Sequence, residues 1–137
     1  MIIMEEIYSV FDQSEVISVY DGGVKTSYSS GSDGYGKILN SWNDMIAGSH
    51  QMPAFGVSIN DLTVKEMQTG KWVEFEFGKK LTCCGMPFEK LLVAVNKDYY
   101  GFNLIRYESE RGYDGRCFYL DLVGKNMGEF YDLLCNL

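Results

Sequence analysis

The sequence is poor in proline, in histidine and in basic residues. Of its 137 residues only two are prolines and one is a histidine. A disordered chain would be richer in proline and in charge, whereas 46% of these residues are hydrophobic and 23% are charged. Because this length is typical of one domain, we expect residues 1–137 to form a single packed globular domain.

Long hydrophobic runs are also missing. No stretch approaches the roughly 18 apolar residues of a membrane helix, so no membrane span is expected. A secretory signal would need a basic start and a longer apolar segment. Residues 1–22 instead carry no basic side chain and five acidic ones, Glu5, Glu6, Asp12, Glu15 and Asp21. The resulting prediction is a cytoplasmic protein.

Lysine and arginine together number 12 against 19 acidic residues, which gives a net charge of −7. Affinity for DNA or RNA comes mainly from basic side chains that neutralise phosphates, so direct nucleic-acid binding is not expected. An acidic protein is suited to docking on a basic surface of another protein. The predicted partner is therefore a protein with a basic surface, while the oligomeric state is left open.

The four cysteines and the single histidine do not follow a metal-binding pattern. Cys83 and Cys84 are adjacent, and no C-x-x-C spacing is present. We therefore expect neither a site that combines His50 with this pair nor a disulfide between neighbours, which would be strained. Reduced thiols are predicted, with Cys117 and Cys135 in the core and the pair in a turn. No metal and no cofactor are predicted. No catalytic residue is predicted either, because His50 has no nucleophile motif around it.

Apolar patterns predict an α+β fold. Val73, Phe75 and Phe77 alternate with other residues in KWVEFEFG, as in a half-buried antiparallel strand, whereas Ile38 and Trp42 recur at helical spacing. Strands cluster instead of alternating with helices, which favours a mainly antiparallel sheet of about six strands with about three helices. The expected strands are residues 15–20, 24–28, 71–78, 88–96, 101–109 and 116–123, with 54–59 extended and 79–87 a turn region. The expected helices are residues 37–48, 63–70 and 126–134, the last two opening with capping boxes, Thr63 with Glu66 and Asn126 with Glu129.

The stretch GSDGYGK matches the phosphate-binding pattern G-x-x-x-x-G-K with Gly31, Gly36 and Lys37. A phosphate loop also needs a buried strand before it and a hydroxyl after the lysine. Here the preceding strand is polar and Ile38 follows the lysine. We therefore interpret residues 31–37 as a glycine-rich turn in which Ser32 or Asp33 caps the next helix.

Acidic and aromatic residues alternate in two stretches that we predict to form an exposed partner-binding surface. Carboxylates steer toward basic partners, and tyrosine and tryptophan are common anchors in protein interfaces. The first stretch is the polar face of the strand at 71–78, and the second is the expected hairpin tip YESERGYD. The predicted binding residues are Trp72, Glu74, Glu76, Tyr107, Glu108, Glu110, Tyr113 and Asp114.

In size, acidity and lack of a catalytic motif, the chain resembles small inhibitors that phages and mobile elements make against nucleic-acid-handling defence enzymes, and immunity proteins that neutralise toxins. This resemblance is one of composition and involves no shared motif. It implies a non-enzymatic protein-binding module that occupies a basic, nucleic-acid-type site on its partner. Two alternatives stay open: a small nucleotide- or phosphate-binding enzyme using residues 31–37, and a structural subunit of a larger assembly, suggested by the aromatic content of 15%.

Overall fold

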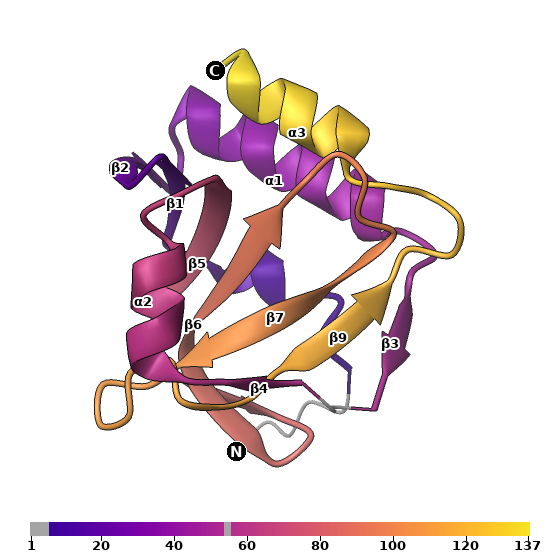
Figure 1. Ribbon diagram of the computed structural model, residues 1–137. Coiled ribbons are helices and arrows are strands. Elements are labelled where there is room, and N and C mark those ends of the chain that lie inside the picture. The colour runs from indigo at the N-terminus through magenta and orange to yellow at the C-terminus, as the bar shows by residue number, and fades with distance from the viewer. Residues whose placement is uncertain (1–5, 54–55) are drawn as a thin grey trace.

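The computed structural model describes residues 6–53 and 56–137 and shows a curved sheet with helices on both faces (Figure 1). The strands are β1 (Val16–Asp21), β2 (Val24–Ser29), β3 (His50–Met52), β4 (Val57–Ser58), β5 (Lys71–Cys83), β6 (Met86–Val95), β7 (Gly101–Tyr107), β8 (Gly115–Arg116) and β9 (Phe118–Asp121). The helices are α1 (Asp33–Ile46), α2 (Asn60–Glu66) and α3 (Gly128–Cys135), and a 3-10 turn, η1 (Val10–Gln13), precedes β1.

The predicted α+β class and the antiparallel sheet are confirmed. Seven strands of the described residues form the main sheet in the order β2-β1-β5-β6-β7-β9-β3, and β4 and β8 form a separate pair. Each recorded pairing is antiparallel. The β1–β2 hairpin turns at Gly22 and Gly23, whose φ angles of +58° and +85° suit a tight turn that few other residues would adopt.

Strand β5 is longer than the sequence pattern predicts, so the expected turn region at 79–87 is wrong. The strand continues to Cys83, and its register with β6 shifts between Glu76 and Leu81, where Gly78 has a φ of +69°. An irregularity of this kind bends a strand while its pairing continues. Only Cys84 and Gly85 form the turn, with φ angles of +55° and +76°.

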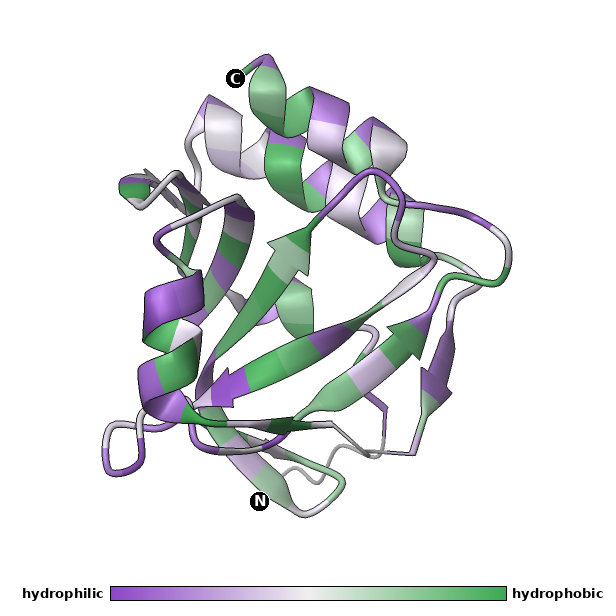
Figure 2. Cartoon of the chain, in the orientation of Figure 1, coloured by the Kyte–Doolittle hydropathy of each residue, from purple (hydrophilic) through white to green (hydrophobic). Residues whose placement is uncertain are grey.

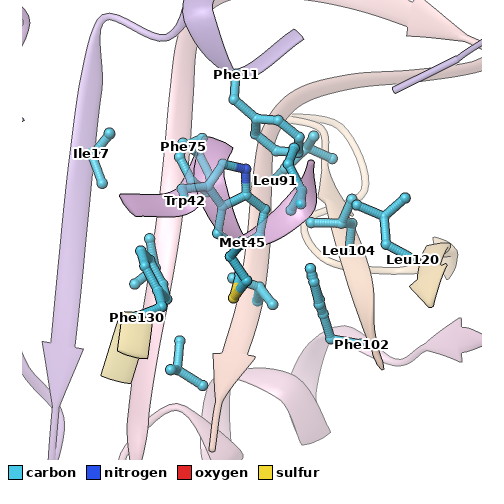
Figure 3. Close-up of a cluster of buried hydrophobic side chains, with 14 of the residues drawn as sticks. Phe11, Ile17, Trp42, Met45, Phe75, Leu91, Phe102, Leu104, Leu120 and Phe130 are labelled. Atoms are coloured by element: carbon cyan, nitrogen blue, oxygen red, sulfur yellow. The ribbon is translucent and has the colours of Figure 1, made fainter. Parts of the chain in front are cut away.

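One face of the sheet carries the main core. Val73, Phe75 and Phe77 are fully buried on it, as their alternation predicts, and α1 and α3 cover it. Trp42 of α1 lies at the centre of this core (Figure 3). Its ring centroid is 4.9–5.4 Å from those of four phenylalanines, Phe11, Phe75, Phe102 and Phe130. Edge-on and tilted contacts of this kind add to the hydrophobic stabilisation of a core.

The three helices lie where the sequence predicts them, but none begins at the predicted residue. Helix α2 begins at Asn60, so Thr63 lies inside it and shares a 2.5 Å hydrogen bond with Ser58 instead of capping the helix. Helix α3 begins at Gly128, whose backbone N–H donates to the Asn126 side chain. Of the stretch expected to be extended, residues 54–55 lie outside the described residues, and 57–58 form β4.

The glycine-rich stretch at 31–37 does not form a phosphate loop. Helix α1 already begins at Asp33, and the Ser32 hydroxyl accepts a hydrogen bond from the Tyr35 backbone N–H, which confirms the predicted cap. Gly36 and Lys37 therefore lie within the helix, and Lys37 forms an ion pair with Asp33 at 3.0 Å. The preceding strand, β2, is an edge strand with mostly exposed residues.

Each glycine of this stretch has its own local environment. Gly31 has a φ of +91°, which turns the chain between β2 and α1. A Cβ at Gly34 would overlap the Tyr28 ring, so this glycine lets the hairpin pack against the start of α1. At Gly36, by contrast, a Cβ would meet no heavy atom of the described residues within 4 Å outside its own helix.

We expect opposite effects from alanine at the two helical glycines. Gly34→Ala should lower the free energy of unfolding by about 1–3 kcal/mol through overpacking against Tyr28. Gly36→Ala should raise it by about 0.5–1 kcal/mol, because alanine favours a helix interior. Urea denaturation of the two variants and the wild type measures both effects. Equal changes in the two variants would contradict the packing role of Gly34.

Candidate functional site

The two acidic and aromatic stretches singled out in the sequence meet on the second face of the sheet. Trp72 and Glu74 project from β5, and the loop after β7 folds back so that Tyr113 reaches them. Tyr113 also packs against Tyr107, with ring centroids 5.0 Å apart. Helix α2 and this loop, residues 108–114, form a second layer over this face, and Met67 and Leu92 complete a small core beneath it.

The Glu74 carboxylate is the centre of this cluster and is fully buried. Its Oε2 accepts a 2.5 Å hydrogen bond from the Tyr113 hydroxyl, and its Oε1 accepts one of 3.2 Å from the Tyr20 hydroxyl. Burial raises the pKa of Glu74, while the hydrogen bond from Tyr113 and the nearby Lys90 ammonium act in the opposite direction. Burial and the neighbouring carboxylate also raise the pKa of both tyrosines. We call Tyr20, Glu74 and Tyr113 the tyrosine–glutamate cluster.

Lys90 and Glu76 form the more open side of the site. The Lys90 Nζ lies 3.5 Å from the Glu76 carboxylate and 4.8 Å from the centroid of the Tyr107 ring. Both Glu76 and Tyr107 are half-buried. This arrangement places one positive charge next to two carboxylates, since Lys90 also acts on Glu74.

Loop 108–114 is tied to helix α2 by side-chain hydrogen bonds. Asp114 Oδ1 accepts from the Asn60 backbone N–H at 2.6 Å, and the Asn60 side-chain oxygen accepts from the Tyr113 backbone N–H at 2.9 Å. The Asp114 carboxylate thus satisfies a free N–H at the start of α2. The sequence pattern predicted that the capping box of Thr63 and Glu66 would fill this role. On the other side of the loop, Lys80 forms ion pairs with Glu110 at 3.1 Å and with Glu108 at 3.7 Å.

The expectation that all eight predicted binding residues are exposed is wrong. Trp72, Glu74, Glu108 and Tyr113 are buried, and of the eight only Glu110 and Asp114 are exposed. The alternation of β5 correctly predicts that Trp72, Glu74 and Glu76 share a face. It does not reveal that α2 and loop 108–114 cover that face.

Sequence reasoning missed three residues of this site: Tyr20 of the tyrosine–glutamate cluster, and Lys90 and Asn60 beside it. A signal exists for Tyr20, because the alternation of β1 puts it on the face opposite Ile17 and Val19. Tyr20 lies across from Trp72 in the β1–β5 register, and no pattern within β1 predicts that pairing.

A groove of about 310 Å³ lies beside the cluster. It is lined by Glu66, Trp72, Ala94, Tyr99, Gly101, Phe102, Asn103, Ile105 and Tyr119. Glu74 is not among these residues, and its two oxygens bind tyrosine hydroxyls. Its carboxylate therefore acts as an internal anchor for the second layer and does not face a ligand in the groove.

The cysteines and the histidine lie apart from this cluster. The sulfur atoms of Cys83 and Cys84 are 3.5 Å apart, and burial, with the hydrogen bond to Cys84, raises the pKa of Cys83 to about 12. Cys117 is buried as expected, whereas Cys135 is exposed and not in the core. His50 is exposed at the start of β3. In the described part of the chain, no three His, Cys, Asp or Glu side chains gather closely enough to bind a metal ion.

Comparison of the chain with family models, with curated proteins and with solved structures finds no significant match. Across residues 6–53 and 56–137, none of the helices has the length and the apolar character needed to cross a membrane.

Replacing Glu74 by glutamine tests whether the buried carboxyl sets the pH dependence of stability. A raised pKa means that the folded state holds this proton more tightly, so the contribution of Glu74 is largest below the ordinary value of 4.5 and falls as the pH rises. Glutamine cannot ionise and keeps the size and an acceptor. We therefore expect the stability of Glu74→Gln, measured against the wild type by urea denaturation, to increase from about pH 4 to pH 7.

The matched control is Glu66→Gln, the same chemical change at an exposed position of α2. A stability difference between Glu74→Gln and the wild type that stays constant with pH would contradict the raised pKa of the buried Glu74 carboxyl.

Proposed function

We propose that the protein is a cytoplasmic, non-enzymatic binding module that presents an acidic surface with an apolar centre to a basic surface of another protein. The observation that carries this proposal is a ridge of exposed apolar side chains on β4, on the residue that precedes α2 and on α2 itself. These side chains, Val57, Ile59 and Leu62, are 71%, 60% and 51% exposed. We call them the apolar ridge.

The backbone geometry points the three side chains of the apolar ridge to solvent as neighbours. Val57 and Ile59 flank Ser58, which is buried, so the alternation of extended backbone points both of them to solvent. Ile59 and Leu62 are three residues apart at the start of α2, where such positions are neighbours on a helix surface. Hydrophobic and hydrophilic residues alternate along α2 (Figure 2). Adjoining exposed apolar side chains, rimmed by polar ones, are typical of interaction sites.

Exposed carboxylates lie on the α2 side of the apolar ridge, whereas Val57 at its other end pairs with Arg116 of β8. Asp61 and Glu66 are exposed on α2 itself, and Asp114 and Glu110 are exposed on loop 108–114, which is bonded to the start of α2. Charged rims steer association toward a surface of opposite charge, while apolar contacts at the centre supply most of the affinity. With a net charge of −7, the complementary partner is a protein with a basic site.

A basic site built to bind nucleic acid fits this chemistry, because it already attracts negative charge to a defined groove. This supports an inhibitor that occupies a nucleic-acid-type site, such as an anti-defence protein of a phage or mobile element, or an immunity protein against a toxin. The second layer supports this proposal, because hydrogen bonds of Asn60 tie α2 to loop 108–114 and the tyrosine–glutamate cluster holds that loop on the sheet. Rigid presentation lowers the entropy lost on binding.

Charge reversal at the rim tests the proposal. Asp61→Lys, Glu66→Lys and Glu110→Lys together should weaken binding to the partner by about tenfold or more, because they invert the charge that faces it. Glu108 and Asp114 are left unchanged, since the first is buried and the second holds the start of α2. Affinity capture from the native host identifies partners by mass spectrometry, and titration then measures each affinity.

The control is Asp44→Lys, Asp98→Lys and Glu129→Lys, the same change of charge at exposed positions outside α2 and loop 108–114. The proposal predicts a partner that the wild type and the control bind and that the rim variant loses. It also predicts that Ile59→Ser with Leu62→Ser loses the same partner. Equal binding by the rim variant and the control would show that this surface is not the contact.

A further inference from the structure

All the arginines of the chain line one cavity. Arg106, Arg111 and Arg116 are the only three in the sequence, and they surround a cavity of about 710 Å³. They come from β7, loop 108–114 and β8, and the turn between β5 and β6 contributes Cys84 and Gly85. A concentration of positive charge is unexpected in a chain with a net charge of −7. We call this space the arginine cavity.

Lysines and arginines of the described residues differ in how their charges are compensated. The six ion pairs of this part of the chain all use a lysine, Lys37, Lys71, Lys80, Lys90 or Lys97. None of them uses an arginine, although 19 carboxylate side chains are present in the sequence. The three guanidinium groups around the arginine cavity therefore have no carboxylate of the described residues at ion-pair distance.

Arg106 is the buried arginine of this cavity, and hydrogen bonds hold it in place. Its side chain is only 6% exposed, and its Nε and Nη1 donate 2.7 Å hydrogen bonds to the backbone oxygens of Arg116 and Pro87. These two bonds fix the plane of the guanidinium. Nη2 makes no hydrogen bond with a described residue. Burial lowers the pKa of Arg106, and Glu108, the acidic group that acts on it, is itself 3.7 Å from Lys80.

Gly115 makes room for this guanidinium. Its φ is +129°, and a Cβ built on it would lie 2.9 Å from Arg106 Nη2. Any other residue here would crowd the one nitrogen that has no protein partner. The absence of a side chain at Gly115 thus leaves space beside Nη2, and Arg106 lines the arginine cavity together with the exposed Arg111 and Arg116.

A guanidinium presents paired N–H donors that match the oxygens of a phosphate, and three of them balance a dianion. The volume of the arginine cavity lies within the range of small-molecule pockets. Val57 and Met86 also line the cavity and offer apolar surface to an organic group. We propose that the arginine cavity binds a phosphate monoester of a small molecule, with Arg106 as the fixed donor and Arg111 and Arg116 closing on the phosphate. This inference does not rest on the proposed function.

Calorimetric titration of the full chain with phenyl phosphate at constant ionic strength tests the proposal. Phenyl phosphate combines a dianionic group with an apolar group, and benzoate serves as the carboxylate comparison. The test variant is Arg111→Gln with Arg116→Gln, because both side chains are exposed and hydrogen-bond to no described residue, so the fold should be retained. The matched control is Lys25→Gln with Lys79→Gln, which removes the same charge from exposed positions elsewhere.

We expect saturable binding of phenyl phosphate to the wild type and to the lysine control, and binding weaker by about tenfold or more in the arginine variant. Absence of saturable binding to the wild type, or equal affinities of the two variants, would overturn the proposal. Benzoate binding as tightly as phenyl phosphate would overturn the phosphate class. A phosphoserine peptide or an oligonucleotide that binds through these arginines when phenyl phosphate does not would overturn the small-molecule assignment.

Alkylation of Cys84 gives a local readout in the same protein. Cys84 is exposed and lines the arginine cavity, and Cys135→Ser removes the other exposed thiol. Phenyl phosphate should slow the reaction of Cys84 with iodoacetamide in this background, and it should not do so when Arg111→Gln and Arg116→Gln are added. An unchanged rate at saturating phenyl phosphate would place the ligand elsewhere and overturn the assignment of this cavity.

Discussion

The burial of Glu74 between two tyrosine hydroxyls is the constraint on which the second face of the molecule depends. A carboxylate removed from water destabilises the folded state unless hydrogen bonds and nearby charge compensate it. Here Tyr113, Tyr20 and Lys90 provide part of that compensation, and burial still raises the pKa of the carboxyl. Because Tyr113 belongs to loop 108–114, the same hydrogen bond that satisfies Glu74 also fixes the loop on the sheet.

The consequence is a sheet covered on both faces by different means. On one face α1 and α3 bury a conventional aromatic core around Trp42. On the other, one short helix and a loop cover a small apolar cluster with a polar centre. The second layer is tied together by Asn60 and Asp114, so the outward residues of α2 and the loop are held in a defined relation to each other. The proposed docking surface, formed by the apolar ridge and its exposed carboxylates, lies on this second layer, and Arg111 of the loop also lines the arginine cavity.

Local patterns predicted much of this architecture and only part of the candidate site. The alternation in KWVEFEFG correctly placed Phe75 in the core and Glu74 on the opposite face, because a strand turns successive side chains to opposite sides. It did not distinguish an exposed face from one covered by a distant segment. The expected helix starts at Thr63 and Asn126 differ from the observed ones, Asn60 and Gly128, by three and two residues. At the first of these helices a partner from elsewhere in the chain, Asp114, satisfies the helix end.

The sequence by itself determined the α+β class, the antiparallel pairing, the hairpin at Gly22 and Gly23 and the acidic character. Each of these follows from neighbours within a few residues or from composition alone. Only the tertiary structure decided that Glu74 is buried, that Gly34 serves packing against Tyr28, and that the three arginines meet around one cavity. These features depend on how different elements of the chain pack: β5 against loop 108–114, β2 against α1, and one loop against two strands. The physical reason is that burial and charge compensation depend on which surfaces meet in the folded chain, and the order of residues along a single strand or helix does not specify that.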